Sequence, residues 1–307
     1  MIKLSVNYCG SLFTNPFILP SGIVTEISEL QKAINAGVGG VTLKSLTLNK
    51  REGNPVPRVW KYDCGFINSV GLANSGIEKG AKDIAGLLKE KPKAPIIVSL
   101  FATKIKEFSY LVEKIAPLKP NFIELNLSCP NVDDDFGKPL GMEKGAAGKI
   151  VKEVKKVSGK VPVLAKLSPN VSDIGEIAKS CEAEGADGIV AINTVGPGMI
   201  IDIKRKMPIL GAKKGGVSGP GILPVTVRCV YEIYDAVKIP IIGMGGVTKW
   251  QDVVEVMLAG ATLVGVGTGT YLKGMGVFDE LKKGLNEYLV TNNYTKPSQI
   301  VGLAHKS

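Results

Sequence analysis

The sequence predicts an α/β fold, a (β/α)8 TIM barrel, and three features of the chain support that expectation. Eight short apolar runs alternate with amphipathic helical patterns along the 307 residues. Each run is nearly all apolar and ends in small or polar residues, as expected of parallel strands that are buried on both faces. The even spacing and the count of eight favour a closed barrel over a doubly wound sheet. We therefore expect residues 1–307 to form a single barrel domain.

The predicted strands are joined by segments with a helical period. Residues 28–37, 173–186 and 249–261 carry apolar side chains three and four positions apart and then reach a glycine. Parallel strands need such crossover connections, because each strand must return to the same end of the sheet. The predicted strands are residues 16–22, 39–45, 94–101, 122–128, 161–168, 187–194, 239–246 and 261–268.

Two insertions and an N-terminal segment interrupt this alternation. Residues 46–76 follow the second predicted strand, and residues 195–221 follow the sixth. Both follow a strand, on the side of a barrel where active sites form, and long loops without a regular pattern are usually functional. Residues 4–17 have a turn-like centre at Cys9 and Gly10, which predicts a hairpin that closes the bottom of the barrel.

The charge balance favours a small anionic ligand over nucleic acid. The net charge is +10, and most of the excess is lysine. The lysine-rich run 151–160 has a helical pattern, which is typical of a solvated helix face. Nucleic-acid binding favours arginine interleaved with aromatic residues. The only arginines are Arg51, Arg58, Arg205 and Arg228.

The cysteines and the apolar segments indicate a reduced, cytoplasmic protein. The five cysteines lie far apart and form no CxxC pair, so no zinc or iron–sulfur site is indicated. The first ten residues lack the apolar core of a signal peptide. The apolar run 253–272 contains Glu255 and several glycines and divides into helix, turn and strand, which argues against a membrane span.

Polar side chains gather where the predicted strands end. In a barrel these ends share one face, so Lys44, Lys166 and three asparagines would meet there with the thiol of Cys129. Buried polar groups are unfavourable unless they are paired, so a set of this kind indicates a functional site. The residues at these ends are Ser21, Gly22, Lys44, Ser45, Asn126, Cys129, Asn131, Lys166, Ser168, Asn193, Thr194, Gly245, Gly246, Gly267 and Thr268.

The last two strands end in glycine-rich sequences that indicate a phosphate site. Backbone N–H groups after the seventh and eighth strands of a barrel commonly bind phosphate. No GxGxxG sequence follows the first strand, which disfavours a Rossmann-bound nicotinamide. A mononucleotide cofactor such as FMN fits the barrel mouth, and Lys44 or Lys166 could then stabilise negative charge on a reduced flavin.

Cys129 is the candidate for proton transfer. The only histidine is His305, close to the end of the chain, which disfavours a Cys–His nucleophile pair. A thiol among lysines can lose its proton readily and serve as a general base for a carbon-bound proton. Cys181 and Cys229 lie on helical patterns and suit an inert, buried role.

Several long motifs resemble class 1 dihydroorotate dehydrogenases, in order, from about residue 4 to residue 290. The resemblance implies a catalytic barrel that binds FMN and oxidises (S)-dihydroorotate to orotate in pyrimidine synthesis. The motifs are GNPVPR (53–58), GFINSVGLANSG (65–76), NLSCPNV (126–132), KLSPNV (166–171), INTVGPGM (192–199), GGVSGPGILP (215–224) and IPIIGMGGV (239–247).

The resemblance also implies roles for individual residues. Cys129 matches the catalytic base, which takes the C5 proton while C6 passes a hydride to flavin N5. Matching substrate contacts are Lys44, Asn68, Gly71, Leu72, Asn126, Asn131, Asn193 and Thr194. Matching flavin contacts are Ser21, Lys44, Ser45, Asn126, Lys166, Ile192, Gly219, Gly245, Gly246, Gly267 and Thr268.

The chain departs from the family pattern in two places. Ser99 stands near a position where the family often has an asparagine that touches the flavin. The sequence after CPNV matches neither the fumarate-using nor the NAD-linked subclass, whereas residues 198–210 and 166–171 resemble the NAD-linked subclass. That subclass works with a second subunit that bears FAD and an iron–sulfur cluster, and the family leads us to expect a homodimeric core.

Three other functions stay open from the sequence. A dihydropyrimidine dehydrogenase-like flavoenzyme is the nearest, although its motif tends to read CPHG where this chain has CPNV. A non-redox, phosphate-binding barrel of the aldolase type would use Lys166 to form a Schiff base. A basic binding module without catalysis would bind nucleic acid with an affinity that falls steeply with salt.

Overall fold

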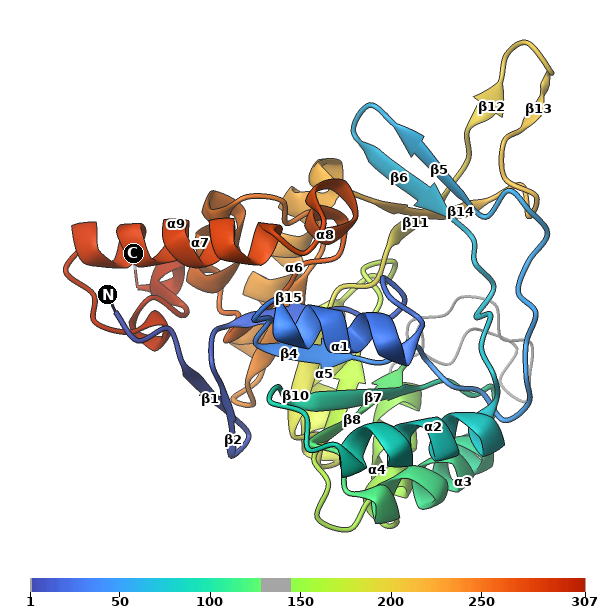
Figure 1. The fold of residues 1–307 in the computed structure, drawn as a ribbon, viewed down its shortest axis with the longest axis horizontal. Helices are drawn as coiled ribbons and strands as arrows, with labels where there is room; N and C mark the ends of the chain where they lie inside the picture. Colours follow the sequence, from blue (N-terminus) through green and yellow to red (C-terminus); the bar gives the residue numbers. More distant parts are fainter. Residues whose placement is uncertain (1, 128–144, 307) are drawn as a thin grey trace.

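The computed structural model describes residues 2–127 and 145–306, and the eight predicted strands form a closed barrel within them (Figure 1). Neighbouring strands of the barrel are all parallel, and they follow one another around it in chain order. The predicted fold class is thereby confirmed. The barrel strands are β3 (Phe17–Leu19), β4 (Gly40–Thr42), β7 (Ile96–Leu100), β8 (Phe122–Asn126), β9 (Val163–Lys166), β10 (Gly188–Ala191), β15 (Ile241–Met244) and β16 (Leu263–Gly265).

Amphipathic helices cover the outside of the barrel and bury their apolar faces against the strands. The three helices predicted from their period are α1, α5 and α7. α5 begins after Asp173, whose carboxylate accepts the backbone N–H of Glu176 at 2.9 Å and so satisfies a free donor of the first turn. The helices are α1 (Ile27–Asn35), α2 (Ile77–Lys89), α3 (Ile105–Ile115), α4 (Ala146–Lys155), α5 (Ile174–Ala183), α6 (Leu223–Ala236), α7 (Trp250–Leu258), α8 (Thr268–Lys273) and α9 (Val277–Thr291), with short 3₁₀ helices at Ala116–Leu118, Pro220–Ile222, Pro297–Gln299 and Leu303–His305.

The predicted N-terminal hairpin closes the amino-terminal end of the barrel. β1 (Val6–Tyr8) pairs antiparallel with β2 (Ser11–Phe13), and Cys9 and Gly10 form the turn. The Tyr8 hydroxyl donates to the carbonyl oxygen of Pro240, just before β15, at 3.2 Å. Tyr8 and Phe13 pack with inward-pointing apolar side chains of the barrel strands. The lower half of the barrel interior is therefore an apolar core.

The two insertions are not structureless loops, because they join each other in a second sheet. β11 (Val195–Gly198), β14 (Gly215–Ser218), β6 (Gly65–Asn68) and β5 (Val59–Tyr62) lie in that order, and all the pairs are antiparallel. The insertions meet in the pairing of β6 with β14, and the backbone N–H of Gly211 also donates to the carbonyl oxygen of Pro57 at 2.9 Å. The second insertion also forms a small hairpin, β12 (Ile201–Asp202) and β13 (Met207–Pro208), which projects from the body (Figure 1).

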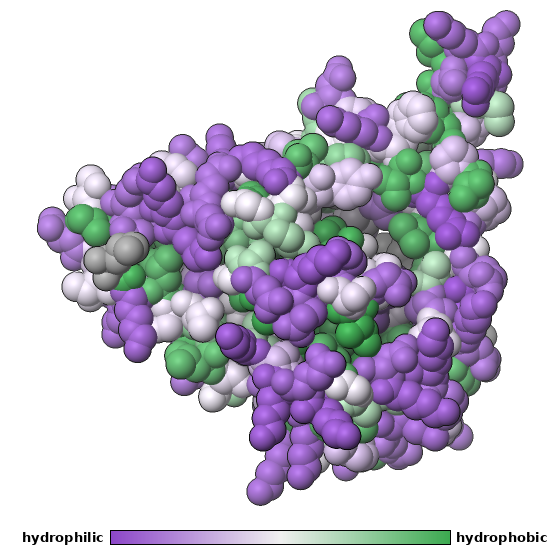
Figure 2. Space-filling model, viewed as in Figure 1, coloured by the Kyte–Doolittle hydropathy of each residue, from purple (hydrophilic) through white to green (hydrophobic). Residues whose placement is uncertain are grey.

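The surface agrees with the lysine-rich composition. Hydrophilic residues cover most of the face shown in Figure 2, and apolar residues appear among them on the projecting hairpin. Ile203 at its tip is 84 % exposed. In the part of the chain that the structure describes, no helix is both long and apolar enough to span a membrane.

Candidate active site

A cavity of about 1460 Å³ lies at the carboxyl ends of the barrel strands, between the barrel and the second sheet. It brings together nearly all the predicted site residues that the structure describes. The exceptions are Gly219, which packs against Gly65 instead, and Ser168, whose hydroxyl accepts the backbone N–H of Asn170 at 3.2 Å. Cys129 and Asn131 lie outside the described residues. The predicted residues that line the cavity are Ser21, Lys44, Ser45, Asn68, Gly71, Leu72, Asn126, Lys166, Ile192, Asn193, Thr194, Gly245, Gly246, Gly267 and Thr268.

The barrel interior changes from apolar to polar toward this cavity. Successive residues of a strand point to opposite faces, so Phe122, Glu124 and Asn126 of β8 all point inward. Phe122 belongs to the lower apolar core, whereas Asn126 lines the cavity. In the same way, Leu164 and Lys166 of β9 belong to the lower and upper levels. The alternation of each strand thus sets a polar layer directly on top of an apolar one.

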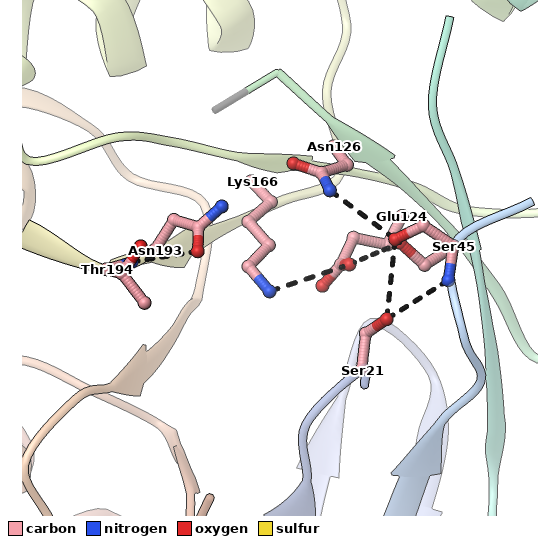
Figure 3. Close-up of polar contacts among 8 residues, drawn as sticks. Ser21, Ser45, Glu124, Asn126, Lys166, Asn193 and Thr194 are labelled. Carbon is pink, nitrogen blue, oxygen red and sulfur yellow. Dashed lines mark hydrogen bonds and ion pairs between the residues drawn. The ribbon is translucent and has the colours of Figure 1, made fainter. Parts of the chain in front are cut away.

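A chain of hydrogen bonds links this polar layer across four strand ends (Figure 3). The hydroxyls of Ser21 and Ser45 lie 3.3 Å apart, and those of Ser45 and Ser99 lie 2.8 Å apart. Ser99 Oγ donates to Glu124 Oε1 at 2.7 Å, and Lys166 Nζ lies 4.0 Å from the same oxygen. All of these groups except the partly exposed Ser21 are buried, and each has a polar partner, which removes most of the penalty for burying it.

Asparagines secure the loops on the other side of the cavity. The side-chain oxygen of Asn193 accepts the backbone N–H of Thr194 at 2.8 Å. Asn170 donates to the carbonyl oxygen of Thr194 at 3.3 Å and accepts the backbone N–H of Gly196 at 2.9 Å. The end of β10 and the start of the second insertion are therefore held against β9.

The predicted substrate-contacting loop after β6 is similarly braced. Leu72 has a positive φ of 55°, an uncommon conformation for a residue with a side chain. The Asn74 side chain donates to the Leu72 carbonyl oxygen at 2.7 Å and to Thr47 Oγ1 at 2.8 Å. Thr47 follows β4, so the bracing connects this loop to the barrel. Leu72 is thus tied through Asn74 to the segment that follows β4.

The glycines after β15 expose their backbone to the cavity. Gly246 has a φ of 79°, and an added Cβ would lie 2.7 Å from the backbone nitrogen of Leu223 at the start of α6. A Cβ at Gly245 would meet the Thr226 hydroxyl. No side chain fits at either position, so glycine backbone forms this part of the wall, as in a phosphate-binding loop.

The described cysteines other than Cys64 are poor candidates for reactivity. Cys181 on α5 and Cys229 on α6 are completely buried, as predicted from the helical patterns. Burial raises the pKa of Cys181 to about 12 and that of Cys229 to about 11. Burial, followed by the charge of Asp187, raises the pKa of Cys9 to about 12. Neutral thiols at these positions are inert near neutral pH.

Reasoning from the sequence missed two contributors and left one position undecided. Glu124 was treated as part of a buried strand, although an acid within an otherwise apolar run, two residues from Asn126, signals an inward-facing polar layer. Asn170 belongs to the KLSPNV motif (166–171), but nothing else in the sequence indicates that it contributes to the site. Ser99 is fully buried, donates to Glu124 and is not one of the cavity-lining residues.

Taken together, the fold and the cavity define a barrel enzyme with its site at the carboxyl ends of the strands, rich in amides, hydroxyls and ammonium groups. The family model for dihydroorotate dehydrogenase matches residues 3–289. The chain therefore belongs to the dihydroorotate dehydrogenase family, which is flavin-dependent. This confirms the predicted family and enzyme class.

Curated relatives match over nearly the whole chain. The catalytic subunit of dihydroorotate dehydrogenase B (NAD(+)) from Pyrococcus abyssi is 44 % identical, and the match covers 99 % of each chain. The protein of the same name from Methanosarcina mazei is 40 % identical over 97 % of this chain and 94 % of its own. The one from Methanothermobacter thermautotrophicus is 38 % identical over 98 % of each. The predicted resemblance to the NAD-linked subclass agrees with these names.

Proposed function

We propose that this chain oxidises (S)-dihydroorotate to orotate with FMN in the cavity, and that Cys129 is the general base. The observation that carries the proposal is that one cavity gathers all but one of the described residues that the family resemblance assigned to substrate or flavin. The family membership favours this activity over the aldolase and nucleic-acid alternatives.

The residues of the cavity fit FMN by their chemistry. The bare backbone at Gly245 and Gly246, with Gly267 and Thr268 nearby, supplies N–H donors suited to a phosphate. Ser21 and Ser45 supply hydroxyls suited to the polar edges of a ring. When bound, FMN supplies the hydride acceptor that this oxidation needs.

The substrate requires a different set of groups. Dihydroorotate is a ring with two imide-type edges and a carboxylate, so it needs amides that donate and accept, and one cation. Asn68, Asn126 and Asn193 supply the amides, and Lys44 supplies the cation; all four line the cavity. We propose that they hold the ring so that Cys129 can remove the proton from C5.

The test is an anaerobic, single-turnover measurement of flavin reduction by dihydroorotate. Cys129→Ala should leave the protein yellow and slow the reduction by about 100- to 10,000-fold, the contribution of a positioned base. Cys229→Ala is the matched control, because that thiol is buried on a helix away from the cavity. Normal reduction in Cys129→Ala would remove Cys129 from this role, and turnover of dihydrouracil instead of dihydroorotate would replace the substrate.

We further propose that the chain passes electrons to NAD through a second subunit that carries FAD and an iron–sulfur cluster, and that two copies of the chain form the core. The support is that the relatives are named as catalytic subunits of NAD(+)-linked enzymes. The isolated chain should reduce a dye but not NAD at a useful rate. Light scattering should give twice the chain mass of 32.5 kDa. Rapid NAD reduction by the chain alone would contradict the partner.

A further inference from the structure

A buried carboxylate that the proposed mechanism does not use lies directly behind the cavity wall. Glu124 is 1 % exposed and is not one of the cavity-lining residues. Ser99 donates to it at 2.7 Å from β7, and the Lys166 ammonium lies 4.0 Å away on β9. A buried carboxylate is strongly unfavourable unless it is paired, so these two contacts account for its presence.

The carboxylate sets the direction of each hydrogen bond that leads away from it. An ionised carboxylate only accepts, so Ser99 must donate to Glu124 and present its lone pairs to Ser45. The Ser45 hydroxyl then donates to Ser99 at 2.8 Å and leaves its own oxygen as an acceptor. Asn126 Nδ2 donates to that oxygen at 3.4 Å. Figure 3 shows the amide nitrogen directed toward Ser45 and the amide oxygen directed away from it.

We propose that Glu124 is a positioning residue of the active site, which holds the Lys166 ammonium at the cavity wall and, through Ser99 and Ser45, orients the Asn126 amide. An oriented amide beside a cation suits a ring with neighbouring N–H and C=O groups. This use of the wall rests on the proposed function, whereas the network itself does not.

The first test uses flavin-free protein and follows Lys166 directly. Glu124→Gln keeps the shape of the side chain but removes the charge that pairs with the ammonium. Acetylation of Lys166 by N-hydroxysuccinimide acetate, quantified by peptide mass spectrometry, should become about tenfold faster, which corresponds to about 1.4 kcal/mol of lost pairing. The exposed lysines of the same sample provide the internal reference rate.

The second test measures orotate binding to the flavin-loaded protein by the change in flavin absorbance. Ser99→Ala breaks the chain between Glu124 and Ser45 and should raise the Kd for orotate about 2- to 12-fold, the range of one net hydrogen bond. The double variant that combines Glu124→Gln with Ser99→Ala should bind orotate no more weakly than Glu124→Gln alone. Both substitutions break the same chain of hydrogen bonds, so their effects should not add.

Ser158→Ala is the matched control for Ser99→Ala. Both serines are fully buried, but no hydrogen-bond partner was found for the Ser158 hydroxyl within the described structure. Ser158→Ala should match the wild type in both tests. A merely structural role for Ser99 would give the two variants the same orotate affinity.

Wild-type acetylation and orotate affinity in Glu124→Gln, or additive effects in the double variant, would overturn the proposal. If Glu124→Gln does not fold, as thermal unfolding would reveal, Ser99→Ala and its control decide through the orotate measurement. A wild-type protein that holds no flavin and binds no orotate would instead refute the proposed function. The acetylation test would then still decide whether Glu124 holds Lys166.

Discussion

Gly246→Ala tests whether the bare backbone after β15 is a binding surface. Gly246 has a φ of 79° and lines the cavity. The added Cβ would lie 2.7 Å from the backbone nitrogen of Leu223, a distance that the two segments can relieve only by moving apart. Gly274→Ala is the matched control, because Gly274 has a φ of 69° but no heavy atom within 4 Å of the added Cβ, and it does not line the cavity.

The structure separates the two contributions to the loss of stability. A left-handed conformation costs a residue with a Cβ about 1–2 kcal/mol, and both variants carry that cost. Forcing a methyl group into a filled space adds about 1–3 kcal/mol, and only Gly246→Ala carries that cost. For a chain of this size each kcal/mol lowers Tm by about 2–4 °C. Gly246→Ala should therefore melt about 2–12 °C below Gly274→Ala.

The assay combines thermal unfolding of the flavin-free proteins with FMN titration. If the backbone at Gly245 and Gly246 binds the phosphate, loss of one hydrogen bond to a charged group should weaken FMN binding in Gly246→Ala by about 10- to 100-fold. Gly274→Ala should bind FMN as the wild type does. Equal Tm values and equal FMN affinities in the two variants would refute both the steric argument and the assignment of the phosphate site.

Three further predictions concern other parts of the chain. Lys44→Ala should weaken the binding of both FMN and orotate; full occupancy with normal reduction kinetics would contradict its assignment. In folded protein at pH 8, iodoacetamide should alkylate the exposed Cys64 but not Cys181 or Cys229, as mass spectrometry would show, because burial raises the pKa of the latter two to about 12 and about 11. These thiols ionise above pH 9.0, their ordinary pKa, in the unfolded chain but stay neutral in the folded one. Their contribution to the free energy of unfolding should therefore fall as pH rises from 9 toward 11. An equal dependence of the free energy of unfolding on pH in Cys181→Ala and the wild type would contradict this. His305→Ala removes hydrogen bonds to α6 and to the end of α7, and should lower Tm by several degrees without changing FMN affinity; an unchanged Tm would show that the C-terminal contact is not stabilising.

The barrel could be predicted because its strands are buried on both faces. Such strands read as continuous apolar runs, and their regular alternation with helices leaves few other topologies. All eight predicted ranges contain a barrel strand. The hairpin at the N-terminus was predictable from its turn alone, although the packing of Tyr8 into the barrel was not.

The second sheet could not be predicted, because its central pairing is non-local. β6 pairs with β14 although Ile67 and Val217 are about 150 residues apart in the chain. β14 contains two glycines at its start, so its sequence lacks the alternation that marks a strand. The site residues on this sheet were assigned only through the family resemblance, which supplied Asn68 where periodicity gave no signal.

The polar layer of the barrel explains why the site residues are mutually dependent. Glu124 and Lys166 are each almost fully buried, and removal of one would leave the other as a buried charge without its counter-ion, which is unfavourable. Ser99 and Ser45, which lead from Glu124 to Asn126, cannot reorient while the carboxylate remains ionised, because it accepts but cannot donate. The donors and acceptors of this wall are therefore fixed before a ligand arrives, and binding need not reorganise them. A wall that is preorganised in this way favours a ligand with one pattern of ring edges, so changes behind the cavity should alter selectivity as well as affinity.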